Sequence, residues 1–442
     1  MFRDPRPLRP VALTALVAGA ALLPVTMRTP AGERVVSPSG KNAVVRAASV
    51  IPPRSADSGT RSASETPADS GIPFKSIRPD SADAVRWVPS LIGLMTEARA
   101  PETQRRQAAL LLGRMGRRAA PAVPHLAELL RRTRNRLRAS VESAGDERTP
   151  DLQSRLLWEL KAVSLFGPVA AVTAEEIIEI AEDVRMPLAV RQAAYEALAR
   201  IGPAAPGAVS ALAKALTRPR FAPSTSAADR TFFRATVVEC AALLGDAAAP
   251  LLPTLIRLLD EADELIRRNA LLCLAALGRR AAAAQPAVFR VLLFDGEPAV
   301  RETAAATLAR LGPSTLGPLA RLLEEPMPET RRLAAMALQQ HPDVRHVLTA
   351  LRRRWSRESD AVTWVTLAET ICDAAPAEAD AVVPGLLKRW DSLPRSVRIR
   401  VYRLLQRMSA RHASVRVAIR AHLPRNPPAV LRRLADDRGD GQ

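Results

Sequence analysis

The sequence predicts an all-α protein, a right-handed α-solenoid of about nine to ten helical pairs preceded by an export signal or anchor and a disordered linker. Three observations predict this fold. A twelve-residue pattern recurs along most of the chain, usually at intervals of a little over thirty residues. A second, Leu-rich pattern with Pro near its start lies between the copies. Aromatic residues make up only 3% of the chain, and its mainly Ala, Leu and Val apolar content suits closely packed helices better than sheets.

The recurring unit is an Arg followed eleven residues later by Gly, as in RQAAYEALARIG at 191–202. Its fourth, eighth and eleventh residues are apolar and form one stripe of an α-helix. The terminal Gly suits the left-handed conformation that ends a helix. Further copies lie at 105–116, 234–245, 267–278, 301–312, 331–342 and 398–409, and two weaker copies without the Arg end at Gly167 and Asp373.

The second pattern places Pro in an apolar first turn ahead of a Leu stripe. It occurs at 88–95, 123–130, 252–259, 317–323 and 383–390. Pro in a first turn removes no helical hydrogen bond, so it can recur at helix starts. Each such helix and the Arg-to-Gly helix after it should form one antiparallel pair, and neighbouring pairs should stack because no pair can bury its stripe alone.

This arrangement resembles the HEAT-repeat family, especially its short, roughly thirty-residue variety found also in phycobiliprotein-lyase-like proteins. The resemblance covers about residues 81–410 and includes acidic residues ahead of the Arg, such as Asp183 before Arg191 and Asp295 before Arg301. It implies an architecture and carries almost no information about chemistry.

The pattern divides the chain into five segments. These are a signal peptide or N-terminal membrane anchor at 1–27, a disordered Ser/Pro-rich linker at 28–80, the solenoid at 81–410, capping helices at 411–436 and a disordered tail at 437–442. Basic residues precede an apolar run from Val11 to Met27, which is the layout of an export signal. We therefore expect a periplasmic, extracellular or membrane-anchored protein with its repeats outside the cytoplasm; cleavage and retention remain open.

The formal net charge is +19, and only five of the 64 basic residues are Lys. An Arg-rich coding bias spread along the chain is one interpretation. The other is a positively charged face that binds nucleic acid, anionic lipid or an acidic protein. Cys240, Cys273 and Cys372 contain no CxxC pair, so we expect them to be small buried hydrophobes.

One set of Arg residues occupies the same register in successive units: Arg105, Arg191, Arg234, Arg267, Arg301, Arg331 and Arg398. They are either a stripe that binds phosphate or carboxylate groups, or structural residues. We favour the structural interpretation, in which each pairs with an acidic residue of the preceding turn and ties adjacent repeats together.

Two basic runs are candidate partner-binding sites. The first contributes Arg131, Arg132, Arg134, Arg136 and Arg138, and the second contributes Arg352, Arg353, Arg354 and Trp355. Clustered guanidinium groups near an aromatic ring can hold phosphates or acidic peptides. A solvated helix face is the alternative.

The chain carries no HExxH, GxSxG, P-loop or GxGxxG motif, and we assign no catalytic, metal or cofactor residue and no cofactor. The prediction is a non-catalytic scaffold that binds a protein or peptide through its concave surface or through the inserted loops 132–151 and 217–230. Two alternatives remain: a nucleic-acid-binding protein with a basic groove, and a lyase-like enzyme or maturation factor.

Overall fold

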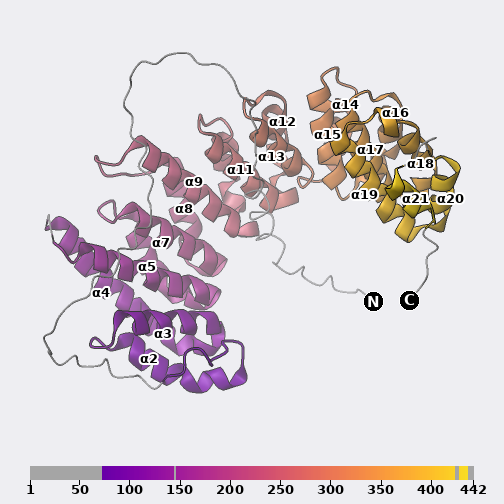
Figure 1. The fold of residues 1–442 in the computed structure, drawn as a ribbon. Helices are drawn as coiled ribbons and strands as arrows, with labels where there is room; N and C mark the ends of the chain where they lie inside the picture. Colours follow the sequence, from indigo (N-terminus) through magenta and orange to yellow (C-terminus); the bar gives the residue numbers. More distant parts are fainter. Residues whose placement is uncertain (1–71, 144–145, 424–427, 437–442) are drawn as a thin grey trace, which may run out of the picture. The chain divides into compact units, whose positions relative to one another are not determined.

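The computed structural model describes residues 72–143, 146–423 and 428–436, and all regular structure in these ranges is helical (Figure 1). The predicted signal at 1–27, the linker up to residue 71 and the tail at 437–442 lie outside the described residues. Within the described part, the prediction of an all-α fold built from paired helices is confirmed. The handedness of the solenoid stays a prediction.

The described chain forms ten consecutive helical pairs. They are α2 (Val88–Thr96) with α3 (Glu102–Met115), α4 (Val123–Glu142) with α5 (Thr149–Phe166), α6 (Ala174–Glu182) with α7 (Leu188–Ile201), α8 (Ala208–Thr217) with α9 (Ala227–Leu243), α10 (Leu252–Leu258) with α11 (Glu264–Leu277), α12 (Gln285–Phe294) with α13 (Pro298–Leu308), α14 (Leu316–Leu322) with α15 (Pro328–Gln340), α16 (Leu348–Arg357) with α17 (Ala361–Ala374), α18 (Ala379–Lys388) with α19 (Arg395–Arg411), and α20 (Ala413–Ala421) with α21 (Ala429–Asp436).

The second helices of successive pairs pack against one another, from α3 on α5 through to α17 on α19. Among the first helices, α4 packs on α6, α6 on α8 and α8 on α10. Each helix thus contacts its own partner, and the second helix of each pair also contacts the second helix of the next pair. This nearest-neighbour stacking is the arrangement of a solenoid, in which one apolar core runs through all the repeats.

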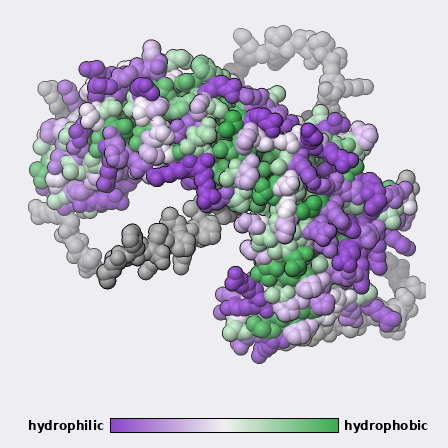
Figure 2. Space-filling model, turned by 180° about the vertical axis from the view of Figure 1, so that it is seen from behind, coloured by the Kyte–Doolittle hydropathy of each residue, from purple (hydrophilic) through white to green (hydrophobic). Residues whose placement is uncertain are grey.

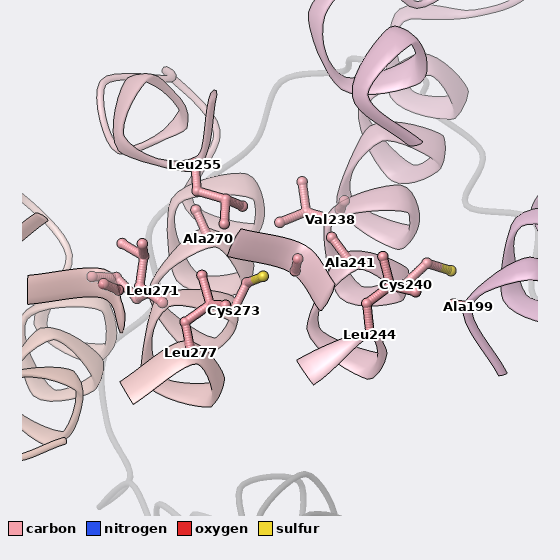
Figure 3. Close-up of a cluster of buried hydrophobic side chains, with 14 of the residues drawn as sticks. Ala199, Val238, Cys240, Ala241, Leu244, Leu255, Ala270, Leu271, Cys273 and Leu277 are labelled. Atoms are coloured by element: carbon pink, nitrogen blue, oxygen red, sulfur yellow. The ribbon is translucent and has the colours of Figure 1, made fainter. Parts of the chain in front are cut away.

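The predicted apolar stripe is the core of this stack. Ala194, Leu198 and Ile201 all have no exposed surface, and the matching positions of the other Arg-to-Gly units are also buried. Figure 3 shows one such layer between α9 and α11, where Cys240 and Cys273 lie among Leu, Val and Ala side chains. All three cysteines are free and buried, which confirms the prediction that they act as small hydrophobes, and this burial raises the pKa of the Cys273 thiol to about 12.

The glycines that end the repeated helices have positive φ, as predicted, but their ψ differs from a left-handed helical turn. Gly116 has φ 57° and ψ −124°, and Gly278 has φ 55° and ψ −130°. A Cβ would strain this region, so glycine is required. Short 3₁₀ helices follow directly, η2 at Gly116–Ala122 and η6 at Gly278–Ala284, and lead into the next pair.

Pro stands in the first turn of α2, α4 and α10, as predicted. The prediction for 383–390 is wrong, because α18 begins at Ala379 and Pro384 lies inside it. The turn between Ala379 and Val383 carries its own buried stripe, Ala379, Val382 and Val383. This stripe extends the helix toward its N-terminus beyond the point that Pro alone indicates.

The ordered fold begins earlier than the predicted boundary at residue 81. Ile77 is buried against the first pair, and the Arg118 guanidinium donates hydrogen bonds to the carbonyl oxygens of Pro79 and Asp80. Isolated apolar residues without a period produce no helical pattern, so the sequence alone places residues 72–80 in the linker. At the other end, α20 and α21 occupy the predicted capping segment and bury Val415, Ile419 and Leu431.

One described stretch, 149–182, has the length and composition of a membrane-spanning helix. In the fold it is three elements, α5, η3 (Gly167–Thr173) and α6, and Gly167 has positive φ between the first two. More than half of its apolar window is buried within the protein. Packing within the repeat stack therefore accounts for its composition.

Candidate functional site

The first of the two long insertions in the repeat lengthens helices. Helix α4 has 20 residues, whereas its counterpart α6 in the next pair has 9. At 1.5 Å per residue, α4 is about 16 Å longer. The predicted loop at 132–151 is therefore mostly helical, and the basic run 131–138 lies on the extended half of α4.

The second insertion lies between α8 and α9 and includes a loop at 218–226. Ser226 caps α9, because its hydroxyl accepts a hydrogen bond from the backbone N–H of Asp229 at 3.1 Å. The Phe221 ring packs edge-on against the Phe233 ring, with centroids 5.4 Å apart. These contacts hold the loop against the first turns of α9.

Both insertions border the same polar depression beside the turn between α6 and α7. It has a volume of about 650 Å³ and an open mouth. Its lining residues come from α4 and α6, from that turn and from the second insertion: Arg134, Arg138, Glu179, Glu182, Asp183, Val184, Arg185 and Arg220. Two segments that are far apart in sequence thus meet where the repeat departs from its regular length.

Ion pairs organise the walls of this depression. Arg134 of α4 pairs with Glu179 of α6. Arg185 contacts Asp183 at 2.9 Å and Glu142 at 3.0 Å, which connects the turn to the end of α4. Burial opposes ionisation of Asp183, but the hydrogen bonds from Arg185 outweigh it and lower the pKa of this carboxyl below its usual value. The carboxylates of this wall are therefore already neutralised by neighbouring cations.

A second cavity of about 370 Å³ adjoins the first and shares Glu182 and Arg220 with it. Its interior is formed by Arg191, Tyr195, Phe233 and Ala215, with Lys214, Arg218, Pro219, Arg220 and Glu182 completing the lining. The Tyr195 and Phe233 rings meet edge to face at 5.9 Å, and the Arg191 guanidinium lies over the Phe233 ring at 4.8 Å. Burial raises the pKa of Tyr195 to about 12, so its hydroxyl stays protonated.

Two cations at these cavities have no counter-ion. Within the ranges that the structure describes, the guanidinium groups of Arg218 and Arg220 make no hydrogen bond or ion pair, and both residues are exposed. The backbone carbonyl of Arg220 accepts a hydrogen bond from Arg191 at 2.9 Å, which fixes the main chain beneath its side chain. The site therefore presents uncompensated positive charge at the mouth of an apolar cavity.

The first candidate basic run is only partly at this site. Arg134 and Arg138 line the depression. Arg131 pairs with Glu128 and Glu176, and Arg132 pairs with Glu128. Arg136 is exposed, lines neither cavity and has no side-chain partner in the described chain. Most of the run thus forms salt bridges of the helix surface.

The second candidate run contacts neighbouring pairs and does not line either cavity. Arg352 pairs with Glu378, Arg353 with Glu324 at 2.9 Å, and Arg354 with Glu358 at 2.9 Å. Trp355 stacks on Trp364, with ring centroids 5.8 Å apart. These partners connect α16 to the repeats on both sides, which supports a structural role for the run.

The Arg residues in matching register tie adjacent repeats together, but the acidic partner comes from the following turn and not from the preceding one. Arg267 binds both carboxylate oxygens of Asp295 at 2.7 and 2.8 Å, and Arg331 binds both of Glu358 at 2.9 Å. Arg234 pairs with Glu261, and Arg301 with Glu329. The preceding turn contributes backbone carbonyls instead, such as those of Glu261 and Ala262 to Arg267. The predicted direction of pairing is therefore wrong.

The partners of these Arg residues differ at the insertions and toward the ends of the repeat array. Arg191 donates to the carbonyl of Arg220, in the inserted loop, in place of a carboxylate. Arg105 contacts Glu102 at 3.4 Å and the Met95 carbonyl at 3.3 Å. Arg398 is half-buried, and the segment 424–427, where its following turn would lie, is outside the described residues.

Sequence reasoning named the inserted loop 217–230 but did not single out Arg218 or Arg220 within it. It missed Tyr195, Phe233 and the part that the turn at 183–185 plays in the depression. Two signals could have indicated them. The interval between the units ending at Gly202 and Gly245 is longer than usual, and Phe221, Phe232 and Phe233 cluster there in a chain poor in aromatics. No group of three or more His, Cys, Asp or Glu side chains among the described residues is placed to hold a metal ion.

Comparison with known proteins gives one family match. Residues 286–369, which include most of α12–α17, match the model of HEAT repeats. No curated protein matches the sequence. Similar solved structures include an engineered protein (20% identity, 79% of this chain and 97% of that chain, TM-score 0.36). Another is the karyopherin Kap95p in a complex with RanGDP, with 14% identity over 79% of this chain and 51% of that chain and a TM-score of 0.43. A third is the karyopherin Kap121p bound to the C-terminus of the phosphatase Cdc14p, with 14% identity over 82% of this chain and 42% of that chain and a TM-score of 0.45. The chain spans about half of these karyopherins or less.

Proposed function

We propose that this chain, which is a HEAT-repeat protein, works as a non-catalytic scaffold that binds a protein partner at its two insertions. The observation that carries the proposal is the convergence of both insertions on adjoining cavities with uncompensated cations. The regular repeats use their Arg residues in matching register for contacts between neighbours. The two pairs with insertions, α4 with α5 and α8 with α9, add surface that packing between repeats does not require.

The partner surface is proposed to be acidic. Arg218 and Arg220 are exposed, and the carboxylates nearby are already engaged by Arg134, Arg185 and Lys214. A partner carboxylate would supply the missing counter-charge and accelerate encounter. A stacked helical array also offers a large surface built of many modest contacts, which suits a protein partner.

Site-specific photo-crosslinking tests this binding role. A photo-reactive amino acid replaces Ser224, in the exposed inserted loop, or Gly296, in the exposed turn between α12 and α13, where an added side chain meets no neighbour. We expect a discrete protein adduct from position 224 that disappears in Arg218→Glu/Arg220→Glu and persists in Arg136→Glu. Equal labelling from both positions would overturn the proposal, and an adduct with nucleic acid would favour the basic-groove alternative.

The proposal also places the repeats outside the cytoplasm, on the sequence pattern of residues 1–27. Cell fractionation with protease accessibility on a C-terminally tagged full chain tests this. Repeats digested by protease added outside the cytoplasmic membrane would support the location. A wholly cytoplasmic, soluble pool would contradict it and bring DNA or RNA binding forward.

A further inference from the structure

We propose that the 370 Å³ cavity is an anchor pocket for one aromatic or large aliphatic side chain of a peptide, and that carboxylates beside that side chain pair with Arg218 and Arg220. This inference rests on the proposed binding function and specifies the chemistry of the partner.

The interior is apolar and rigidly built. Tyr195 is 2% exposed and Phe233 is fully buried, and their rings pack edge to face. Phe221 packs edge-on against Phe233 at 5.4 Å. Arg191 is 3% exposed and is held by the carbonyls of Ala181 and Arg220, each at 2.9 Å, so its charge is already engaged. These buried rings form a rigid floor, and the surface that a ligand can contact comes mainly from Pro219 and the alkyl stems of Lys214, Arg218 and Arg220. A rigid floor with such walls suits one bulky apolar group.

The mouth is cationic. Lys214 is bonded to Glu182 at 3.2 Å, which neutralises the carboxylate that lines both cavities. Arg218 and Arg220 remain without a partner among the described residues. A peptide that buries an apolar side chain here brings its flanking residues next to these two guanidinium groups, and carboxylates at those positions complement them.

The connection to the larger depression favours a peptide over a small isolated molecule. The two cavities share Glu182 and Arg220, so an extended chain anchored in the smaller one can continue across the larger one. A buried anchor surrounded by weaker polar contacts is the usual division of binding energy at protein interfaces.

The two tyrosines of the chain, Tyr195 and Tyr402, make a direct test possible. The full-length protein is labelled with 3-fluorotyrosine and titrated with the acetylated, amidated peptide Asp-Asp-Phe-Asp-Asp. Tyr195 lines the cavity, whereas Tyr402 lies on α19 and serves as an internal control. We expect the Tyr195 fluorine signal to shift and the Tyr402 signal to stay, with at least tenfold weaker binding when the peptide Phe is replaced by Ala.

Two variants complete the test. Ala215→Leu fills the cavity and should abolish the Tyr195 response, while unchanged hydrogen exchange in α7–α9 reports that the surrounding pairs are still folded. Arg218→Glu/Arg220→Glu should prefer Lys-Lys-Phe-Lys-Lys over the acidic peptide, and Arg136→Glu should behave as the parent. A shift of both signals, or equal binding of the Phe and Ala peptides, would overturn the anchor pocket. Crosslinking from position 224 would still stand in that case, so failure of this inference is distinct from failure of the proposed function.

Discussion

At the scale of single residues, two buried carboxylates show that the local environment sets the direction in which a pKa shifts. Glu159 of α5 has no exposed surface. One of its carboxylate oxygens accepts hydrogen bonds from the Thr133 hydroxyl at 2.9 Å and from Arg155 Nε at 3.0 Å. The other oxygen has no partner among the described residues. Burial raises its pKa to about 7, although Arg155, Thr133 and Arg105 oppose this shift. Glu358 is also buried but less deeply, and bonds from Arg331 and Arg354 outweigh burial and lower its pKa to about 2.

Glu159→Gln should remove a pH dependence of stability. The folded-state pKa lies above the ordinary value of 4.5, so the carboxylate penalises folding fully above about pH 7 and not at all below about pH 4.5. We expect the variant to match the parent at pH 4.5 and to be more stable at pH 8, by about 3 kcal/mol at most. Urea unfolding at both values measures this; an identical pH dependence in both proteins would contradict it.

Arg331→Met should destabilise the stack by roughly 3–5 kcal/mol, because it leaves Glu358 buried with one ion-pair partner fewer. Arg332→Met is the matched control: that residue pairs with Glu302 on the surface, where a loss of about 0–1 kcal/mol is expected. Glu358 contributes stability above about pH 4.5 that is lost as the pH falls toward 2. Acid unfolding followed by Trp fluorescence should therefore begin at higher pH in Arg331→Met, and similar behaviour of both variants would count against the inter-repeat role.

At the scale of helices, close approach decides which side chains are allowed. Gly385 of α18 lies against the Trp355 indole of α16, and a Cβ built there would be 2.6 Å from the ring. Trp355 cannot retreat easily, because Trp364 stacks on it and Arg389 covers Trp364 at 4.5 Å. The position of the glycine in α18 thus depends on a side chain contributed by another pair.

Gly385→Ala should cost about 1–3 kcal/mol through overpacking, although Ala favours a helix more than Gly. Gly317→Ala in α14 is the control, since nothing lies within 4 Å of its added Cβ. We expect a slight stabilisation there of about 0.5–1 kcal/mol. Thermal unfolding of the two variants separates the effects, and a stabilised Gly385→Ala would show that α16 and α18 do not pack as described.

At the scale of the whole molecule, the stack behaves as a row of units, each stabilised by its neighbours. The core is continuous from Ile77 to Ala435 within the described residues. Polar residues cover much of the face in Figure 2, interrupted by apolar ones. Stability should therefore be local: damage in one pair should spread mainly to the pairs beside it.

Leu431→Asp tests this locality at the C-terminal cap, where Leu431 of α21 is fully buried. Opening the cap exposes Val415 and Ile419 of α20. We expect hydrogen exchange to accelerate in α20 and α19 and to stay slow in α11–α15, as nearest-neighbour coupling requires. Uniform acceleration along the chain would indicate all-or-none unfolding instead.

The helical pairs, the buried stripe and the buried cysteines could all be predicted from the sequence, because residues three, four and seven apart share a helix face whatever the rest of the chain does. The resemblance to HEAT repeats followed from the same period. The direction of the Arg pairing could not be predicted, since Arg267 and Asp295 meet only after one pair stacks on the next. The candidate site also required the tertiary structure: Arg138, Asp183 and Arg220 lie far apart in sequence, and stacking alone brings them to one depression.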